Sequence, residues 1–391
     1  MLELTPAQAK GQQLPPLGLY IHVPFCATAC DYCAFYQTQP TAESVRGFLD
    51  GVAREAGLVR WNRLVETVFW GGGTPGMLAP RALTELGEIV RRQTGGCPAE
   101  WSVEMAPASV TPQRLAALKD LGVTRISMGV QSFQPVLLEA LGRRHTRQQV
   151  LRAYDLVRGA GFASVNLDLI FAVPGQSLDA WRADLDAATD LQPEHISTYC
   201  LTFEEDTALF VKLAQGQVRL DVEKEVAFYT EAWERLEAAG YEQYEISNFA
   251  RAGHQCRHNL NTWRMAEWVG LGPSAASQYD GVRSSNVADL DRWRADIEAG
   301  QRALTDRVEL TPRILAEDSL IFGLRMNEGV ALTALRARFP EASWEKVDAV
   351  AQRMTEEGLA VLGDGRLRLT LRGRLVADAV GGQIMDAFES V

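Results

Sequence analysis

Three cysteines lie within eight residues of one another, as Cys26-x-x-x-Cys30-x-x-Cys33. Thiolates on one short loop can converge on a single centre, and sulfur ligands select soft metals and iron–sulfur clusters. A structural zinc site prefers four protein ligands in two separated pairs, and no second pair is evident here. The spacing therefore favours a [4Fe-4S] cluster whose fourth iron stays open to a small molecule, with structural zinc or free thiols as the alternatives.

The cysteine loop follows the first of six β-type runs that alternate with helical patterns. Strands separated by helices predict a parallel sheet, because a parallel crossover needs a dozen or more residues. The expected strands are Leu17–Val23, Val65–Trp70, Ala99–Met105, Thr124–Val130, Ala163–Ala172 and His195–Leu201, and the main helices between them are Ala42–Trp61, Ala79–Gln93, Pro112–Leu121 and Leu178–Leu191.

Each expected strand carries a polar feature in it or just after it. An open doubly wound sheet and a barrel both fit six units, and both bind ligands at the carboxyl ends of their strands. The cysteine loop follows strand one, and a glycine-rich run with Thr74 follows strand two; the remaining strands bring Glu104, Gln131 with Arg143, Asp168, and Thr202. Together they suggest one shared pocket, and we expect an α/β fold with a partial, open barrel. His195, on strand six, could face the barrel interior or the helices.

The run CATACDYC resembles the CxxxCxxC motif of radical S-adenosylmethionine (SAM) enzymes. This resemblance implies a [4Fe-4S] cluster on Cys26, Cys30 and Cys33, with SAM chelated at the open iron. It also implies reductive cleavage of SAM to a 5′-deoxyadenosyl radical, and a partial (β/α)6 TIM-type barrel, in agreement with the six units.

Further runs narrow the resemblance and cover nearly the whole chain. WGGGTP, VEMAP, RISMGVQSF, LGRRHT and NLDLIFAVPGQ, with GLRMNEGV and RLTLRGRLVADAV near the C-terminus, are similar to oxygen-independent coproporphyrinogen III dehydrogenases and the related heme chaperones, HemW. A carboxylate suits the amino group or ribose hydroxyls of SAM, and an Arg fork suits its carboxylate. The resemblance implies SAM contacts from Tyr20, Tyr32, Gly72, Gly73, Thr74, Glu104, Gln131, Arg143, Asp168 and Thr202.

Two departures point toward the chaperone branch of this group. The dehydrogenase motif continues to a fourth cysteine, as CxxxCxxCxC, where this chain has Phe35. The dehydrogenases also have a longer N-terminal region, whereas 25 residues precede Cys26 here. We therefore expect a protein that binds a cluster, SAM and heme and delivers heme to acceptor hemoproteins, with a reductant for the cluster. The alternative is oxidative decarboxylation of coproporphyrinogen III to protoporphyrinogen IX; a zinc protein with a helical interaction domain is a third.

The run from His258 to Trp263, HNLNTW, resembles the HNxxYW motif linked to heme binding in HemW, with Thr262 in place of the tyrosine. His258 is the expected axial ligand, since neutral imidazole suits heme iron. His254 and Cys256 are alternative ligands, and Asn259 and Trp263 complete the expected heme site. The competing interpretation is that His258 only caps a loop or pairs with backbone.

The C-terminal part has a different pattern. Arg313–Arg325, Leu332–Phe339 and Trp344–Glu357 are expected helices, and Gly363-Asp364-Gly365 between two short β runs predicts a hairpin. Helices followed by a small hairpin resemble a winged helix. We expect a radical SAM domain over residues 1–300 and a winged-helix-like α+β domain over residues 305–391, serving packing or partner docking.

Composition excludes several classes of protein. The 391 residues are 47% hydrophobic and 23% charged, as in globular proteins, and no apolar stretch approaches the ~18 residues of a membrane span. A net charge of −11 argues against broad binding to nucleic acid or anionic membranes. Residues 1–13 lack the basic-then-apolar layout of a signal peptide. We therefore expect a cytoplasmic protein that contacts membranes only through partners.

Overall fold

The computed structural model describes residues 15–218 and 221–389. The N-terminal segment 1–13, on which the expectation about a signal peptide rests, lies outside these residues. Among the helices that the structure describes, none is long and apolar enough to cross a bilayer.

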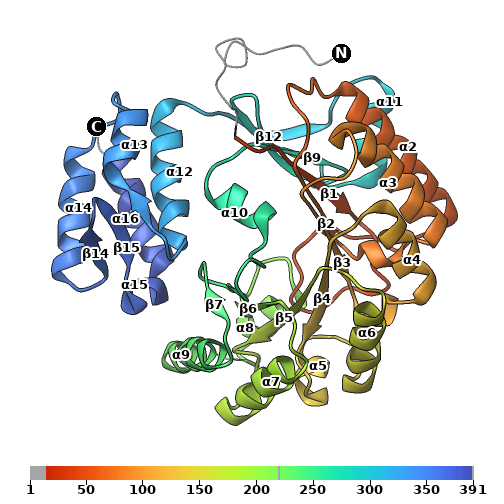
Figure 1. Cartoon of the computed structure of the whole chain (residues 1–391), viewed down its shortest axis with the longest axis horizontal. Helices are drawn as coiled ribbons and strands as arrows, with labels where there is room; N and C mark the ends of the chain where they lie inside the picture. Colours follow the sequence, from red (N-terminus) through yellow and green to blue (C-terminus); the bar gives the residue numbers. More distant parts are fainter. Residues whose placement is uncertain (1–14, 219–220, 390–391) are drawn as a thin grey trace.

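Six parallel strands in sequential order form the centre of the molecule, as the sequence predicts (Figure 1). Pairing runs from β1 to β6 without a change of direction. The sheet curves into a partial barrel with the helices on its outside, which confirms the expected α/β class. The elements are β1 (Gly18–Val23), α2 (Ala42–Leu58), β2 (Thr67–Gly72), α3 (Pro80–Thr94), β3 (Glu100–Met105), α4 (Pro112–Leu121), β4 (Arg125–Gln131), α5 (Pro135–Ala140), α6 (Arg147–Gly159), β5 (Ser164–Phe171), α7 (Leu178–Asp190), β6 (His195–Cys200), α8 (Ala208–Ala214) and α9 (Val222–Ala238).

The six strands alternate between an apolar outer face and a polar inner face. In β4, Ile126, Met128 and Val130 are completely buried in the core under the helices. Arg125 and Ser127, which alternate with them along the strand, point to the other side of the sheet, because successive residues of a strand face opposite ways. The polar side chains are therefore collected inside the barrel, where a ligand can meet them.

The sheet extends beyond the six strands at both edges, which the sequence did not predict. Next to β1 lie four further strands, and next to β6 lie β8 and β7. These elements are β7 (Glu242–Gln243), β8 (Asn248–Ala250), α10 (Arg257–Trp263), β9 (Trp268–Leu271), β10 (Ala276–Tyr279), β11 (Val282–Asn286), α11 (Leu290–Glu298) and β12 (Leu304–Glu309).

A buried carboxylate joins this extension to the barrel. Glu55 of α2 is fully buried and accepts hydrogen bonds from Gly272 N–H at 2.8 Å and Asn286 Nδ2 at 2.7 Å. It also accepts from Trp293 Nε1 and Arg302 Nε, both at 3.2 Å. One side chain thus fixes the loop after β9, β11, α11 and the segment before β12.

The C-terminal unit has its own hydrophobic core. The expected three helices and hairpin are present, and β13 adds a third strand in the order β13-β15-β14. Asp364 and Gly365 adopt φ of 53° and 70°, which is the left-handed turn that their sequence predicts. Because β12 pairs with β11 in the large sheet, the second core starts at α12. The elements are α12 (Pro312–Arg325), β13 (Val330–Ala331), α13 (Leu332–Arg338), α14 (Glu345–Glu356), β14 (Ala360–Gly363), β15 (Arg366–Leu369), α15 (Leu371–Leu375) and α16 (Ala377–Glu389).

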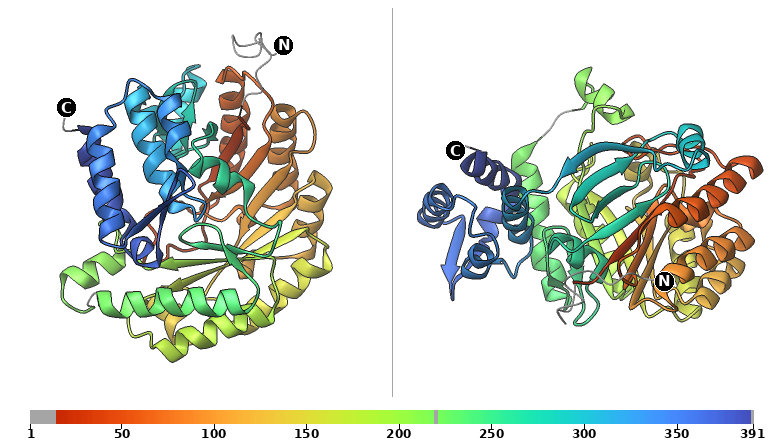
Figure 2. Two further views of the ribbon diagram at one scale, coloured as in Figure 1. Left: turned by 60° about the vertical axis from the view of Figure 1, so that its left-hand side comes forward. Right: turned by 90° about the horizontal axis from the view of Figure 1, so that it is seen from above.

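The C-terminal unit is attached to the barrel near α10 and β7, where α10 packs against α12 (Figure 2). Arg283 of β11 forms an ion pair with Asp318 of α12 at 2.6 Å. The N–H of Asn327 donates to the carbonyl of Tyr244 at 3.0 Å. These contacts come from three separate segments, so they fix the orientation of the unit as well as its position.

Candidate functional site

The three cysteines lie on the loop after β1, which hydrogen bonds hold in place. Cys26 N–H donates to the carbonyl of Thr38 at 3.0 Å, which closes the loop on itself. Asp31, between the second and third cysteines, donates its N–H to the Leu141 carbonyl and forms an ion pair with Lys212 at 2.7 Å. The loop is therefore anchored to the segments after β4 and β6, across the mouth of the barrel.

The three thiols are neighbours in space. Burial raises the pKa of each, and each thiol also raises the pKa of another: Cys30 acts on Cys26, Cys33 on Cys30 and Cys26 on Cys33. Arg143 acts on all three in the opposite direction and favours the thiolates. Within the described residues, no group of three or more His, Cys, Asp or Glu side chains is arranged to hold a single metal ion. Three partly buried thiols beside a guanidinium suit a cluster, in which each thiolate binds a different iron.

The glycine-rich run at the end of β2 packs directly against the start of the cysteine loop. Gly73 N–H donates to the Val23 carbonyl at 2.9 Å, and Thr74 N–H to the Phe25 carbonyl at 2.8 Å. A Cβ on Gly73 would lie 2.6 Å from that Val23 oxygen. Gly72 has φ of 92°, which favours glycine. Glycine is therefore required for the two loops to approach so closely.

Two carboxyl groups, Glu104 of β3 and Asp168 of β5, lie on the inner face of the barrel. Burial raises the pKa of Glu104 to about 8, and the nearby Asp168 adds to this shift. Burial also raises the pKa of Asp168, although Asn166 and Ser127 donate hydrogen bonds to it at 2.8 and 3.2 Å. Glu104 is therefore mostly protonated at neutral pH and can ionise when a cation binds beside it.

Arg143, Tyr32 and Gln131 come together beside the thiols. The Arg143 guanidinium donates to the Tyr32 hydroxyl at 2.8 Å through Nη2. Gln131 has φ of 66° at an irregularity of β4, and a Cβ on Gly129 would meet Gln131 Nε2 at 2.9 Å and Arg143 Nη2 at 3.6 Å. A guanidinium held in this way suits the carboxylate of an amino acid.

The structure thus places most of the expected SAM residues at the mouth or on the inner wall of the barrel. Tyr20 lies on β1, with its hydroxyl 3.3 Å from His22 Nδ1, and its pKa is raised by burial and by Glu104. Thr202 is exposed on the segment after β6, and among the described residues its side chain makes no hydrogen bond to the others of this group.

The expected heme residues are not gathered in one place. His258 of α10 lies at the opposite end of the strands from the cysteines, with Nδ1 3.1 Å from the hydroxyl of Thr67, the first residue of β2. Its ring packs 5.5 Å from that of Phe69, and burial lowers its pKa to about 4. Its imidazole is therefore neutral, as a heme ligand must be, but His258 is only 7% exposed and so is not accessible to a heme in this arrangement.

Cys256 is also enclosed, at the start of α10. Its Sγ lies 3.4 Å from a Glu100 oxygen, and burial raises the pKa of this thiol to about 12. The sulfur therefore stays protonated at neutral pH. His254 and Asn259 are half-buried, and Trp263 at the other end of α10 packs against Phe322 of the C-terminal unit.

A hydrogen-bonded chain inside the barrel connects the start of α10 with Asp168. Cys256 N–H donates to the Tyr244 hydroxyl, which lies 2.8 Å from His195 Nε2. His195 Nδ1–H donates to Asn166 Oδ1 at 2.6 Å, and Asn166 Nδ2 donates onward to Asp168. His195 therefore faces the barrel interior, whereas the sequence alone allowed either the interior or the helices. Burial and the nearby Arg125 lower the pKa of His195 well below its usual value.

The sequence did not identify Arg125, Ser127, Asn166 or Tyr244 as part of this interior. The available signal was the alternation of polar and apolar residues in RISM and NLDL, which marks one face of a strand. Arg125 is 3% exposed, and its Nε and Nη1 have no hydrogen-bond partner among the described residues.

Comparisons with known proteins agree with this geometry. The profile of the radical SAM superfamily matches residues 20–188, and that of the HemN C-terminal domain matches residues 310–376. The heme chaperone HemW of Bacillus subtilis is 32% identical over 94% of this chain and 98% of its own length. HemW of Mycobacterium tuberculosis is 34% identical over 93% of this chain and 94% of its own length.

A solved structure shows the same fold. The structure of coproporphyrinogen III oxidase (HemN) from Escherichia coli, a radical SAM enzyme, superposes with a TM-score of 0.81 at 22% identity, covering 95% of this chain and 90% of that one. The two HemW relatives match this chain almost from end to end, and the radical SAM profile matches its barrel. The chain therefore belongs to the HemW family of radical SAM proteins.

Proposed function

We propose that this protein is a heme chaperone that binds a [4Fe-4S] cluster, SAM and heme, and passes heme to acceptor hemoproteins in the cytoplasm. The similarity to HemW chaperones along nearly the whole chain carries this proposal. The neighbouring thiols and the polar pocket beside them support the cofactor part of it.

Cys26, Cys30 and Cys33 would hold the cluster. Bound there, a reduced cluster with one open iron supplies the electron that cleaves SAM. The chain's own residues bind and orient the SAM molecule. Arg143 suits its carboxylate and Glu104 its amino group, and the glycine run lets the ligand approach the backbone. Tyr20, Tyr32, Gln131, Asp168 and Thr202 complete the proposed set.

Heme binding is proposed at α10, whose motif supplies Cys256, His258, Asn259 and Trp263. In the present arrangement His258 and Cys256 pack against the barrel, and a role as iron ligand would require α10 to move. Trp263 lies on the side of the C-terminal unit, where it packs against Phe322 and lines an open cleft, so a flat ring could reach it without such a movement.

Phe35 is the observation that favours a chaperone over a dehydrogenase. It occupies the position of the fourth cysteine of the dehydrogenase motif, and its side chain is 66% exposed beside the cysteine loop. Oxygen-independent coproporphyrinogen III dehydrogenase is the second candidate function, favoured by the match of the HemN C-terminal profile.

Heme transfer tests the proposal. Anaerobically reconstituted protein is loaded with one heme, separated from free heme, and mixed with a heme-free globin while the Soret band is followed. We expect saturable loading and transfer to the globin. A chain that binds no heme saturably, or that retains its heme with an excess of acceptor, contradicts the proposal.

A further inference from the structure

The motif helix α10 divides its residues between two environments. Thr67 and Phe69, in the barrel, contact His258. Five positions later, Trp263 packs against Phe322 of α12, with the ring centres 5.8 Å apart and the planes tilted by 47°, and the Arg325 guanidinium lies 5.4 Å from the centre of the Trp263 ring. A planar ligand that reaches Trp263 therefore meets the C-terminal unit and not the imidazole of His258.

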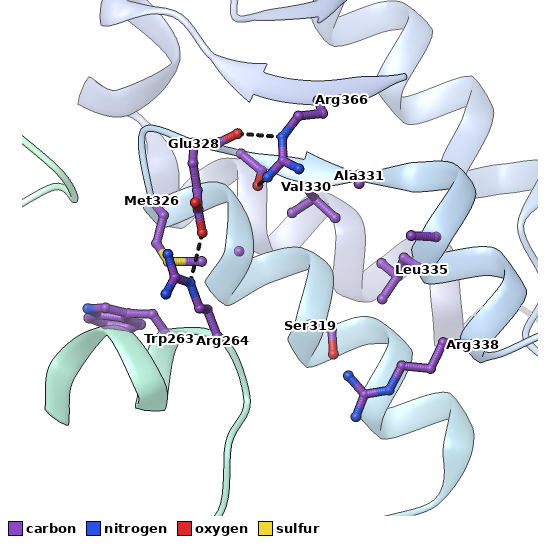
Figure 3. A pocket seen from close by; sticks show the side chains of 13 residues that line it. Trp263, Arg264, Ser319, Met326, Glu328, Val330, Ala331, Leu335, Arg338 and Arg366 are labelled. Carbon is purple, nitrogen blue, oxygen red and sulfur yellow. Dashed lines mark hydrogen bonds and ion pairs between the residues drawn. The ribbon is translucent and has the colours of Figure 1, made fainter. Parts of the chain in front are cut away.

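An open cleft of about 260 Å³ lies at this junction (Figure 3). Trp263 and Arg264, from the end of α10, form one wall, while α12, the loop that follows it, β13, α13 and Arg366 of β15 form the remainder. Apolar parts of the lining include Met326, Val330 and Leu335. Because the cleft is open, a flat ligand larger than its volume can seat one edge there and leave the other edge accessible to an acceptor.

The charges around the cleft are strongly positive for a protein of net charge −11. Three guanidinium groups line it, those of Arg264, Arg338 and Arg366, against the single carboxylate of Glu328. Arg264 already pairs with that carboxylate at 2.9 Å. Arg366 donates to the backbone carbonyls of Glu328 and Gly329, which carry no charge. Arg338 pairs with no carboxylate within the described residues and packs against Phe339.

Polar atoms without partners add to this picture. Trp263 Nε1 and Ser319 Oγ are buried at the cleft and have no hydrogen-bond partner among the described residues. Buried polar atoms are nearly always satisfied in folded proteins. A ligand with carboxylate groups can supply the missing acceptors, and two guanidinium charges without acidic partners suit a dicarboxylate.

We propose that the C-terminal unit forms half of the heme site, and that heme binds in this cleft with its ring against Trp263 and Met326 and its propionates toward Arg338 and Arg366. The inference rests on the proposed function and adds the location and the residues. The edge that projects from the cleft is the part from which an acceptor takes the heme.

Two substitutions on the exposed side of α13 test the cleft. Ala334→Trp fills it, and Arg338→Glu reverses a charge at its rim; both residues are exposed, so the core of the unit is not disturbed. Ala337→Trp, on the same helix but outside the lining, is the matched control. Heme titrations of the full reconstituted chain, followed by the Soret band, compare the variants.

We expect the Kd for heme to rise at least about tenfold in Ala334→Trp and in Arg338→Glu, and to stay unchanged in Ala337→Trp. Heme dimethyl ester, which lacks the propionate charges, should bind more weakly to the unaltered chain and be insensitive to Arg338→Glu. If the unaltered chain binds heme saturably and Ala334→Trp binds it equally well, the cleft is not the site. If the unaltered chain binds no heme, the proposed function itself fails, and this inference with it.

Discussion

The sulfur of Cys26 lies 3.6 Å from the hydroxyl oxygen of Thr74, so the first cysteine of the cluster loop touches the glycine-rich run at the end of β2. The backbone bonds from Gly73 and Thr74 to residues 23 and 25 make this contact possible. A cluster on the cysteines and a ligand on the glycine run would therefore be neighbours, which is the arrangement that binding of SAM at an open iron requires.

Gly73→Ala should disrupt this contact. The added Cβ would lie 2.6 Å from the Val23 oxygen and 2.8 Å from the Phe25 nitrogen, and backbone cannot yield as a flexible side chain can. We expect a destabilisation of about 1–3 kcal/mol and a lower iron content after reconstitution. Gly57→Ala is the control, because a Cβ there meets nothing within 4 Å. Equal iron content in the two variants would show that the close approach of the loops is dispensable.

Serine substitution of the loop cysteines should abolish cluster binding. We expect about four iron and four sulfide per chain in the anaerobically reconstituted protein, the composition of a [4Fe-4S] site. Cys30→Ser should lose most of both, whereas Cys97→Ser, at an exposed cysteine, should keep them. Metal analysis decides this. One zinc per chain and no sulfide would mean that the loop is a different kind of site.

The affinity for SAM should rise with pH up to about 8. The pKa of Glu104 is raised to about 8, so below that pH the ligand-free protein holds a proton that must leave before the carboxylate can accept a hydrogen bond from the SAM amino group. The Kd should therefore fall by up to about tenfold per pH unit between roughly pH 5 and 8, and level off above. Calorimetry in buffers of different ionisation enthalpy measures the released proton. Glu104→Gln should bind weakly at every pH, and a wild-type profile that is equally flat would remove Glu104 from the site.

Removal of the Glu55 carboxylate should strongly destabilise the fold. Glu55→Ala leaves Arg302 and the donors from Gly272 and Asn286 without their acceptor in a buried position. Breaking a buried ion pair costs about 3–5 kcal/mol. Urea unfolding should show this loss, with Glu88→Ala, which removes an exposed partner of Arg91, within about 0.5 kcal/mol of the unaltered protein. A similar small change in both would mean that the extension of the sheet does not depend on Glu55.

The six strands and their order could be predicted because each has a continuous apolar face that packs under helices. Ile126, Met128 and Val130 are an example: their spacing marks both the strand and its outer face. The strands from β7 to β12 have two to six residues and contain many polar side chains, as in Val282–Asn286 (VRSSN), so their local sequence carries a weak signal. They form because they pair with strands far away in the sequence.

The candidate site could be predicted where it depends on residues at strand ends, and not where it depends on packing between distant segments. Cys26 and Thr74 are expected neighbours, since adjacent parallel strands bring their carboxyl ends together. The direction in which Trp263 points depends on how α12 packs against α10, and the burial of His258 depends on the first residues of β1 and β2. No periodicity in HNLNTW contains that information.

One anaerobic reaction tests the central claim most directly. Cluster-loaded protein is incubated with SAM, a reductant, heme and coproporphyrinogen III, and the tetrapyrroles bound to the protein and free in solution are then identified by chromatography. The account predicts that heme elutes with the protein and that coproporphyrinogen III is recovered unchanged. Formation of protoporphyrinogen IX that is lost in Cys30→Ser would contradict it and would identify the protein as a dehydrogenase.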